Sequence, residues 1–188
     1  MQPKYFFENC LRELAKEKLI LDIGGGQAFQ KDMTPYKDWF KDTKYLTVDQ
    51  AAYNPSIIGN IHDLPFEDEY ADGAICKAVL EHVYNPFKVV DEIHRVLKKG
   101  GKLLVWLPFL YPYHGNENYK DYYRYTRDGV EYLFRNFKEL QIVPTKGYFQ
   151  TMMDLTPVLN KIQSIGRFID KLYTIHHQHA GFYIYGIK

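Results

Sequence analysis

Cysteine is scarce in this sequence, and the two cysteines that occur cannot act together. Cys10 and Cys76 are the only ones in 188 residues, and they form no Cys-x-x-Cys motif. This pattern excludes a disulfide framework and a cysteine-based zinc ribbon. It favours a protein of a reducing compartment.

An excess of charge of one sign and a long apolar run are also missing. The 24 lysines and arginines nearly balance the 23 acids, and no run of five like charges occurs. An electrostatic surface for nucleic acid or anionic lipid is therefore not predicted. No segment approaches the roughly 18 apolar residues of a membrane helix, and residues 1–18 lack the apolar run of a signal peptide. We expect a cytoplasmic protein with no membrane span and no nucleic-acid partner.

The sequence does contain an alternation of short apolar runs with amphipathic segments. This alternation is typical of a parallel sheet whose crossovers are helices, so the expected class is α/β. The length suits one domain over residues 1–188. Strands are predicted at 19–24, 44–49, 56–60, 72–76, 102–109, 139–145 and 180–188, and helices at 4–18, 34–42, 85–99, 126–137 and 151–175.

Two of these helices carry recognisable start signals. Thr34 and Asn85 are expected N-caps, and each is followed directly by a proline, which fits the first turn of a helix. Residues 98–100, with the sequence Lys-Lys-Gly, are expected to mark the end of the second helix.

A strand followed by three consecutive glycines is the first feature that indicates chemistry. In "LILDIGGGQAF", Gly24, Gly25 and Gly26 allow a tight turn against which a ligand can lie. The segment lacks the Lys and Ser/Thr of a P-loop, and Phe29 stands where a dinucleotide fingerprint has its third glycine. Asp22, directly before the turn, would oppose phosphates. An acid at this place suits a cationic ligand.

A second acid, Asp49, ends the next predicted strand, about one βα unit later. A carboxylate in that position can accept hydrogen bonds from both hydroxyls of a ribose. NAD and S-adenosylmethionine would both use it, so these residues alone leave both cofactors open.

The remaining motifs separate the two cofactors. "LDIGGG", "VDQ", "LPF", "LEHV" and "RVLKKGG" follow one another in order between residues 19 and 109. In this order the sequence strongly resembles the class I S-adenosylmethionine-dependent methyltransferases of the small-molecule, type 11-like branch. The resemblance implies S-adenosylmethionine as cofactor, with S-adenosylhomocysteine as its product.

Position by position, the resemblance also implies a set of cofactor-binding residues. The turn would lie under the methionine part, Asp49 would bind the ribose, and Gln50 would lie against the adenine. Asn60, where the family usually has an acid, would accept from the adenine amino group, and Lys77 would contribute mainly backbone. The implied set is Asp22, Gly24, Gly25, Gly26, Asp49, Gln50, Asn60, Ile61 and Lys77.

The fold implied by the resemblance is a Rossmann-like sheet of seven strands. Its strand order would be 3-2-1-4-5-7-6, with strand 7 antiparallel and helices on both faces. Because only a short helix precedes the first strand, no separate substrate domain is expected there. Selection of the substrate would then fall to a loop at 108–126 and a helical insert at 151–176.

The loop "PFLYPYHGNENYKDYYRYT" at 108–126 holds six tyrosines. About half of them are expected only to pack the loop onto the core. A loop of this length in a compact domain is usually a binding element, and in this branch similar blocks occur in enzymes associated with sugar or secondary-metabolite pathways. Substrate-side candidates are Tyr113, His114, Asp121, Tyr123 and Arg124.

Two histidines are candidates for catalysis on a small-molecule acceptor. If the acceptor atom is a hydroxyl, a neutral imidazole can take its proton, with His114 as first candidate and His82 as second. His82 follows Glu81 in the "LEH" signature. A packing or capping role for His82 is the stronger expectation.

Three further histidines occur within residues 176–179. His176, His177 and His179 have no carboxylate or cysteine beside them and precede a strand as a polar turn would. They are not expected to bind metal, and no metal site is predicted.

Two other functions compete with methyl transfer. A catalytically silent S-adenosylmethionine-binding protein could use the tyrosine-rich loop to dock or regulate a partner. A nicotinamide-dependent reductase would bind NAD, and S-adenosylmethionine would leave its melting temperature unchanged. Phe29 and Asp22 argue against the reductase.

Overall fold

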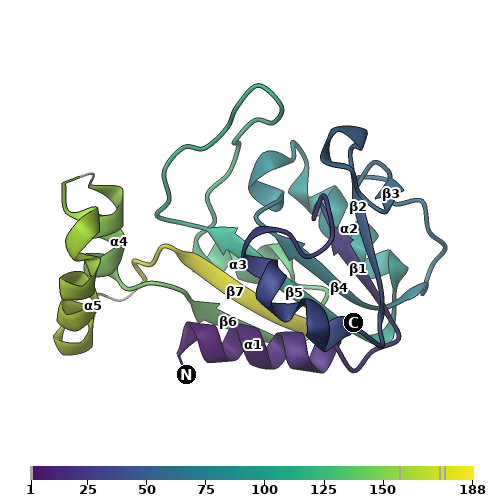
Figure 1. Cartoon of the computed structure of the whole chain (residues 1–188), viewed down its shortest axis with the longest axis horizontal. Helices are drawn as coiled ribbons and strands as arrows, with labels where there is room; N and C mark the ends of the chain where they lie inside the picture. Colours follow the sequence, from purple (N-terminus) through teal and green to yellow (C-terminus); the bar gives the residue numbers. More distant parts are fainter. Residues whose placement is uncertain (1, 157, 174, 176) are drawn as a thin grey trace.

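A computed structural model describes residues 2–156, 158–173, 175 and 177–188 of the chain. In this part of the chain, seven strands form one sheet in the order β3-β2-β1-β4-β5-β7-β6 (Figure 1). β7 runs antiparallel to both β5 and β6, so the predicted class and strand order are confirmed. The strands are β1 Leu19–Ile23, β2 Lys44–Asp49, β3 Ile57–Ile58, β4 Ala71–Lys77, β5 Leu97–Pro108, β6 Lys138–Pro144 and β7 Gly181–Ile187.

The sheet is central because its strands are apolar on both faces. Successive residues of β1 divide between the two faces, so that Ile20 packs into one core cluster and Leu21 into the other. Helices α2 (Pro86–Val96) and α3 (Arg127–Leu133) cover the face of Leu21. Helix α1 (Pro3–Leu14) and the 3-10 helix η1 (Lys31–Phe40) cover the face of Ile20.

Helix α2 begins as its sequence predicts. The Asn85 side chain accepts a hydrogen bond from the Lys88 amide at 3.1 Å, and Pro86 occupies the first turn. The helix ends at Val96, and Leu97 already belongs to β5, so the predicted end at 98–100 is wrong. The strand begins at once because Leu97 already pairs with Ala71 of β4, and Gly100, at a φ of 77°, lies in the register shift before Lys102 pairs with Gly73.

The expected helix at 34–42 differs from the structure in type and in start. η1 is a 3-10 helix that begins at Lys31 with Gln30 as its N-cap residue. Phe29 and Lys31 have positive φ values of 54° and 53°, so the chain turns into the helix before Thr34. The Thr34 hydroxyl lies 2.9 and 2.8 Å from the Phe29 and Lys31 carbonyl oxygens and directs its one hydrogen toward them, instead of capping a helix that follows it.

The expected helical stretch at 151–175 is divided in the structure. It consists of α4 (Tyr148–Leu155), a 3-10 turn η4 (Asn160–Ile162) and α5 (Gln163–Leu172), and positions 157, 174 and 176 lie outside the described residues. α4 and α5 lie side by side, to one side of the sheet (Figure 1). They pack closely, since a Cβ on Gly166 would come within 2.8 Å of the α4 backbone. None of the described helices has the length and apolar character needed to cross a membrane.

Candidate functional site

The glycine turn lies at the carboxyl end of β1, where parallel sheets bind ligands. Gly24 and Gly26 have positive φ values of 72° and 58°. A Cβ on Gly25 would lie 2.3 Å from the Asp22 carboxylate. Positive φ at two positions and close approach at the third explain why this turn requires three glycines.

Asp22 is a buried acid at the base of this turn. It is 6% exposed, and its Oδ2 accepts a hydrogen bond from the Tyr45 hydroxyl at 2.7 Å. Burial raises the pKa of Asp22 to about 6, although the Tyr45 hydrogen bond and the nearby Lys77 act in the opposite direction. With Gly24, Gly25 and Lys77, Asp22 lines a cavity of about 160 Å³.

Asp49 lies at the end of β2 beside the turn, as its sequence position predicts. Its Oδ2 accepts from the Gly26 amide at 3.0 Å, and its Oδ1 accepts from the Gln50 amide at 2.7 Å. Partial burial raises the pKa of Asp49. The nearby Tyr53 hydroxyl is buried and has no hydrogen-bond partner within the described part of the chain. A bound ligand can supply the hydrogen-bond partner that this hydroxyl lacks.

Asn60 and Ile61 lie beyond β3 at the same edge of the sheet. The Asn60 side-chain oxygen accepts from the His62 amide at 3.0 Å, so part of its acceptor capacity is used within the chain. The His62 ring stacks on Tyr84 at a centroid distance of 4.2 Å. Contact of Asn60 and Ile61 with an adenine stays a prediction.

Lys77 ends β4 and joins two cavities. Its ammonium forms an ion pair with Asp32 of η1. Asp32, Lys77 and Ala78 line the cavity at the glycine turn and also a second cavity of about 620 Å³. The two cavities therefore adjoin at the end of β4.

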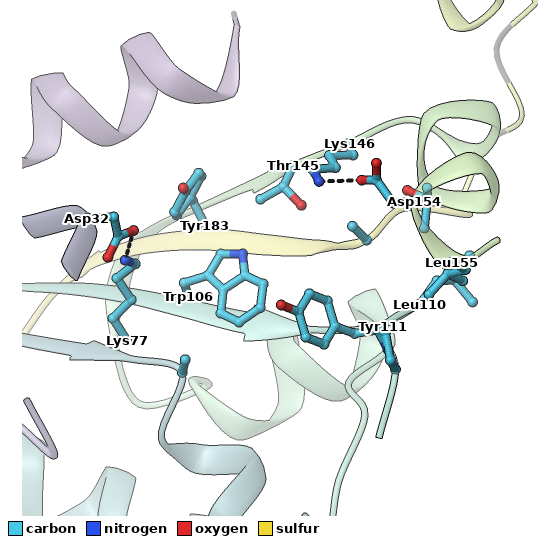
Figure 2. A pocket seen from close by; sticks show the side chains of 14 residues that line it. Asp32, Lys77, Trp106, Leu110, Tyr111, Thr145, Lys146, Asp154, Leu155 and Tyr183 are labelled. Carbon is cyan, nitrogen blue, oxygen red and sulfur yellow. Dashed lines mark hydrogen bonds and ion pairs between the residues drawn. The ribbon is translucent and has the colours of Figure 1, made fainter. Parts of the chain in front are cut away.

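The larger cavity has aromatic walls and two ion pairs, as Figure 2 shows. Trp106 from β5 and Tyr111 from the following loop pack edge to face at 5.6 Å, and Tyr183 of β7 lies close by. Lys77 with Asp32 and Lys146 with Asp154 lie at opposite ends. The 108–126 loop and the 151–176 insert, both named from the sequence for substrate selection, contribute to its lining, but none of the individually predicted substrate residues lines it.

The loop at 108–126 folds back over the 3-10 turn η3 (Leu80–His82). The Tyr122 amide donates to the Glu81 carbonyl at 2.7 Å, and the Tyr125 hydroxyl donates to the Leu80 carbonyl at 2.7 Å. The Tyr123 hydroxyl reaches the Tyr84 carbonyl at 3.0 Å. These contacts hold the loop against the segment after β4, and of the three tyrosines only Tyr125 is buried in the core.

Asp121 and Arg124, both predicted on the substrate side, face each other within the loop. Arg124 donates to the two Asp121 oxygens at 2.5 and 2.6 Å, and to the carbonyls of Tyr111 and Pro112 at 3.1 and 2.7 Å. The Arg124 guanidinium holds the pKa of Asp121 well below its usual range. Tyr113, by contrast, is 73% exposed. Substrate contact by these residues stays a prediction.

The two candidate catalytic histidines come from segments far apart in the sequence and lie together. The rings of His82 and His114 are 4.6 Å apart and nearly perpendicular. Burial lowers the pKa of His82, which favours its neutral form at neutral pH. Beneath them lies the fully buried carboxyl of Glu81, whose pKa burial raises to about 7.

Comparison with known proteins bears on the same segments. Residues 21–105 match the methyltransferase domain of the type 11 family. The match covers 85 of the 188 residues, and over this part the chain is similar to methyltransferase domains. The glycine turn and most of the β4 to β5 unit belong to the matched part of this methyltransferase domain.

Several methyltransferases are similar to the chain. The chloroplastic 2-methyl-6-phytyl-1,4-hydroquinone methyltransferase of Spinacia oleracea is 32% identical over 52% of this chain and 31% of its own length. An S-adenosylmethionine-dependent methyltransferase of Archaeoglobus fulgidus has a TM-score of 0.61 at 13% identity, over 100% of this chain and 95% of that one. The phosphoethanolamine N-methyltransferase 2 of Haemonchus contortus, solved with S-adenosylmethionine, has a TM-score of 0.63 at 14% identity. The match covers 97% of this chain and 52% of that one.

The matches with curated relatives cover between 15% and 42% of those proteins' own lengths. The solved structures extend the likeness in fold to the whole chain, including β6 and β7 outside the matched methyltransferase domain. The 108–126 loop and the α4 and α5 pair also lie outside that domain.

Proposed function

We propose that this protein transfers a methyl group from S-adenosylmethionine to a small-molecule or sugar-type acceptor. The observation that carries the proposal is the junction of two cavities at Lys77. One contains the glycine turn and a buried acid, and the other is large, partly aromatic and lined by polar groups. A cofactor pocket and an acceptor pocket must adjoin in this way for a group to pass between them.

The residues at the glycine turn fit a cofactor of this kind. When bound, S-adenosylmethionine supplies a methyl group on a positively charged sulfur. Asp22 and Asp49 have pKa values raised mainly by burial, so a cationic ligand nearby would stabilise their ionised forms. The buried Tyr53 hydroxyl would gain a partner. The proposed cofactor-binding set is the one predicted from the sequence: Asp22, Gly24, Gly25, Gly26, Asp49, Gln50, Asn60, Ile61 and Lys77.

The acceptor is proposed to occupy the 620 Å³ cavity. Cavities of about 300–1,000 Å³ hold one small organic molecule, with apolar walls for binding and a few polar groups for orientation. Trp106 and Tyr111 provide such walls, while Thr145, Lys146 and Asp154 offer hydrogen bonds suited to hydroxyl groups. The spinach and Haemonchus relatives are named for small organic acceptors, which supports this class.

The chain contributes to the reaction mainly by positioning the acceptor atom. The cavity walls hold the acceptor atom in line with the group it receives and keep bulk water out. A hydroxyl acceptor must also lose its proton, and His114 is the first proposed proton acceptor, with His82 second. His114 does not line the cavity itself, and its ring packs edge-on against Tyr111, which does, at 5.2 Å.

The proposal is tested by measuring S-adenosylhomocysteine formed with a panel of sugars, phenols and phosphorylated alcohols. We expect formation that depends on an acceptor, and a large loss of it in Trp106→Ala with little change in S-adenosylhomocysteine affinity. Trp39→Phe, at a position outside the cavity lining, is the matched control.

Two outcomes would count against methyl transfer. Binding of S-adenosylhomocysteine without turnover on any acceptor would support a silent binding protein. Stabilisation by NAD but not by S-adenosylmethionine in a thermal melt would support a reductase.

A further inference from the structure

Glu81 is a buried acid whose carboxylate has no partner. The residue is 0% exposed, and neither carboxylate oxygen has a hydrogen-bond partner within the described residues. The Nε2 atoms of His82 and His114 lie 3.8 and 3.7 Å from its Oε1. These distances are too long for hydrogen bonds. Each of the three residues nevertheless offers one possible metal-ligand atom, and these three atoms lie within 4.8 Å of one another.

The hydrogen bonds on the far side of each ring determine what faces Glu81. The His82 Nδ1 lies 2.7 Å from the Lys120 carbonyl, and the His114 Nδ1 lies 3.0 Å from the Pro112 carbonyl. A carbonyl only accepts, so each Nδ1 carries the hydrogen and each neutral ring directs an Nε2 lone pair toward Glu81. Two imidazole lone pairs and a carboxylate then converge with no donor between them. A single proton on Glu81 could satisfy only one of the two rings.

We propose that Glu81, His82 and His114 form a binding site for a divalent transition-metal ion, with Zn²⁺ as the first choice. Two imidazoles and a carboxylate are a common ligand set for this ion. Two atoms that each lie about 2.1 Å from a tetrahedral zinc ion are about 3.4 Å apart. The separations of 3.7 and 3.8 Å between Glu81 and the two histidines require closure by a few tenths of an ångström, and the ligand atoms of all three residues lie within 4.8 Å of one another.

The surroundings of the three ligands fit this assignment. Metal-bound histidines almost always donate their other ring nitrogen to a carbonyl or carboxylate, and both rings do so here. Asp121 Oδ2 also lies 3.3 Å from the His114 Nδ1. Arg124, the nearest cation, has its charge balanced by Asp121. Among the described side chains, no lysine or arginine forms an ion pair with Glu81.

This ion would connect the loop to the sheet. Glu81 and His82 belong to η3 at the end of β4, while His114 belongs to the 108–126 loop. Three protein ligands leave a position open, on a cluster separated from the 620 Å³ cavity by Tyr111. With the ion bound, Nε2 of His114 is a ligand and cannot accept a proton. The zinc content of the protein therefore distinguishes the two roles of His114, as a metal ligand or as the proposed proton acceptor. The prediction of no metal from the sequence considered only the histidines at 176–179.

The test titrates the full chain, without a histidine tag and stripped by a chelator, with Zn²⁺ in a calorimeter. We expect one zinc ion per chain, and a visible absorption band when Co²⁺ replaces it. Glu81→Gln, His82→Ala and His114→Ala should each weaken binding by at least about 100-fold, since loss of an outer partner alone costs about 10- to 100-fold. A chain with both His177→Ala and His179→Ala is the matched control and should bind zinc like the unchanged protein.

Each variant is checked for folding by its thermal shift with S-adenosylhomocysteine, which needs none of these three side chains in the proposed cofactor set. Zinc binding that survives in Glu81→Gln and His114→Ala, or that disappears in the control, would overturn the site. Failure of the unchanged protein to bind zinc while it still binds S-adenosylhomocysteine would also overturn it. That last result would leave the proposed methyl transfer untouched.

Discussion

Asp22 is a residue whose burial is unfavourable for stability and which is proposed to bind the cofactor. It is buried next to the glycine turn, with Tyr45 as its only side-chain donor among the described residues. Its pKa in the folded chain is about 6, compared with a model-peptide value of 3.8, so the folded state holds its proton more tightly than the unfolded state does. Stability from this group is full below about pH 4, falls as the pH rises toward 6, and stays reduced above that.

Asp22→Asn should remove this pH dependence. At pH 8 we expect the variant to be more stable than the unchanged protein by about 1 to 3 kcal/mol, and at pH 4 by almost nothing. S-adenosylhomocysteine affinity should fall about tenfold or more, because a charged partner is lost. Urea unfolding at several pH values and calorimetry measure both, with the exposed Asp42→Asn as control. Equal pH dependence in both proteins would contradict the burial argument.

His114 is the residue for which binding and turnover should separate. Its side chain lies on the loop beside Tyr111, and it is not one of the residues proposed to bind the cofactor. In the metal-free chain, His114→Ala should therefore lower turnover by about 10²- to 10⁴-fold, the range for loss of a general base, and change cofactor affinity little. Steady-state assays and calorimetry give the two numbers. His94→Ala, on α2 against Phe137, is the control. Equal loss of turnover and affinity would indicate a folding role.

At the residue scale, the sequence predicted the groups that lie at strand ends. Asp22, the three glycines and Asp49 are placed by strands that apolar runs make recognisable. The unpartnered state of Glu81 could not be predicted, because it depends on where the folded loop places His114, which is distant from Glu81 in the sequence. The signal available was the "LEH" sequence itself, in which only His82 was considered for chemistry.

The element that most shapes the site is the 108–126 loop. Its internal ion pair is nearly buried at one end, with the Asp121 side chain 1% exposed and that of Arg124 25% exposed. Arg124 also ties the two ends of the loop together through the carbonyls of Tyr111 and Pro112. The ion pair therefore holds the loop in one conformation more than it offers charges to a substrate.

Arg124→Gln should release the loop. The Asp121 carboxylate would then be buried without its cation, at a cost of about 3 to 5 kcal/mol if the loop stayed closed. We expect faster hydrogen exchange at residues 110–124 and a lower melting temperature. The double variant Asp121→Asn with Arg124→Gln should recover a large part of the loss, because it leaves no unpaired charge. Additive effects of the two substitutions would show that the pair is not coupled.

Sequence patterns predicted the start of a helix well where packing and capping agree. They predicted it poorly where the backbone conformation of the preceding turn sets the start. α2 has both an apolar stripe and an Asn85 cap, and it begins where expected. η1 contains Thr34 and Pro35, which resemble a helix start, yet the left-handed residues Phe29 and Lys31 begin the helix earlier. Positive φ at residues other than glycine is rare, so the sequence gives little warning of it.

At the scale of the whole molecule, the large cavity is built from segments that no local pattern connects. Asp32, Lys77, Trp106, Thr145 and Tyr183 come from η1, β4, β5, the turn after β6 and β7. The strand order brings them together because β4, β5 and β7 are neighbours in the sheet. The resemblance predicted this order, but the lining depends on side-chain packing between segments. This is why the predicted substrate residues came from one continuous loop.

The same construction provides a way to identify the acceptor. The chain has two tryptophans, and Trp106 lines the cavity while Trp39 packs against Arg12 at 4.0 Å. In Trp39→Phe, Trp106 is the only indole left, so a molecule that enters the cavity should change its emission. We expect true acceptors to give a saturable change, and to bind more tightly when S-adenosylhomocysteine occupies the adjoining pocket. In Trp106→Phe the same molecules should leave the emission unchanged. An acceptor that turns over without altering Trp106 emission would mean that the acceptor binds outside this cavity.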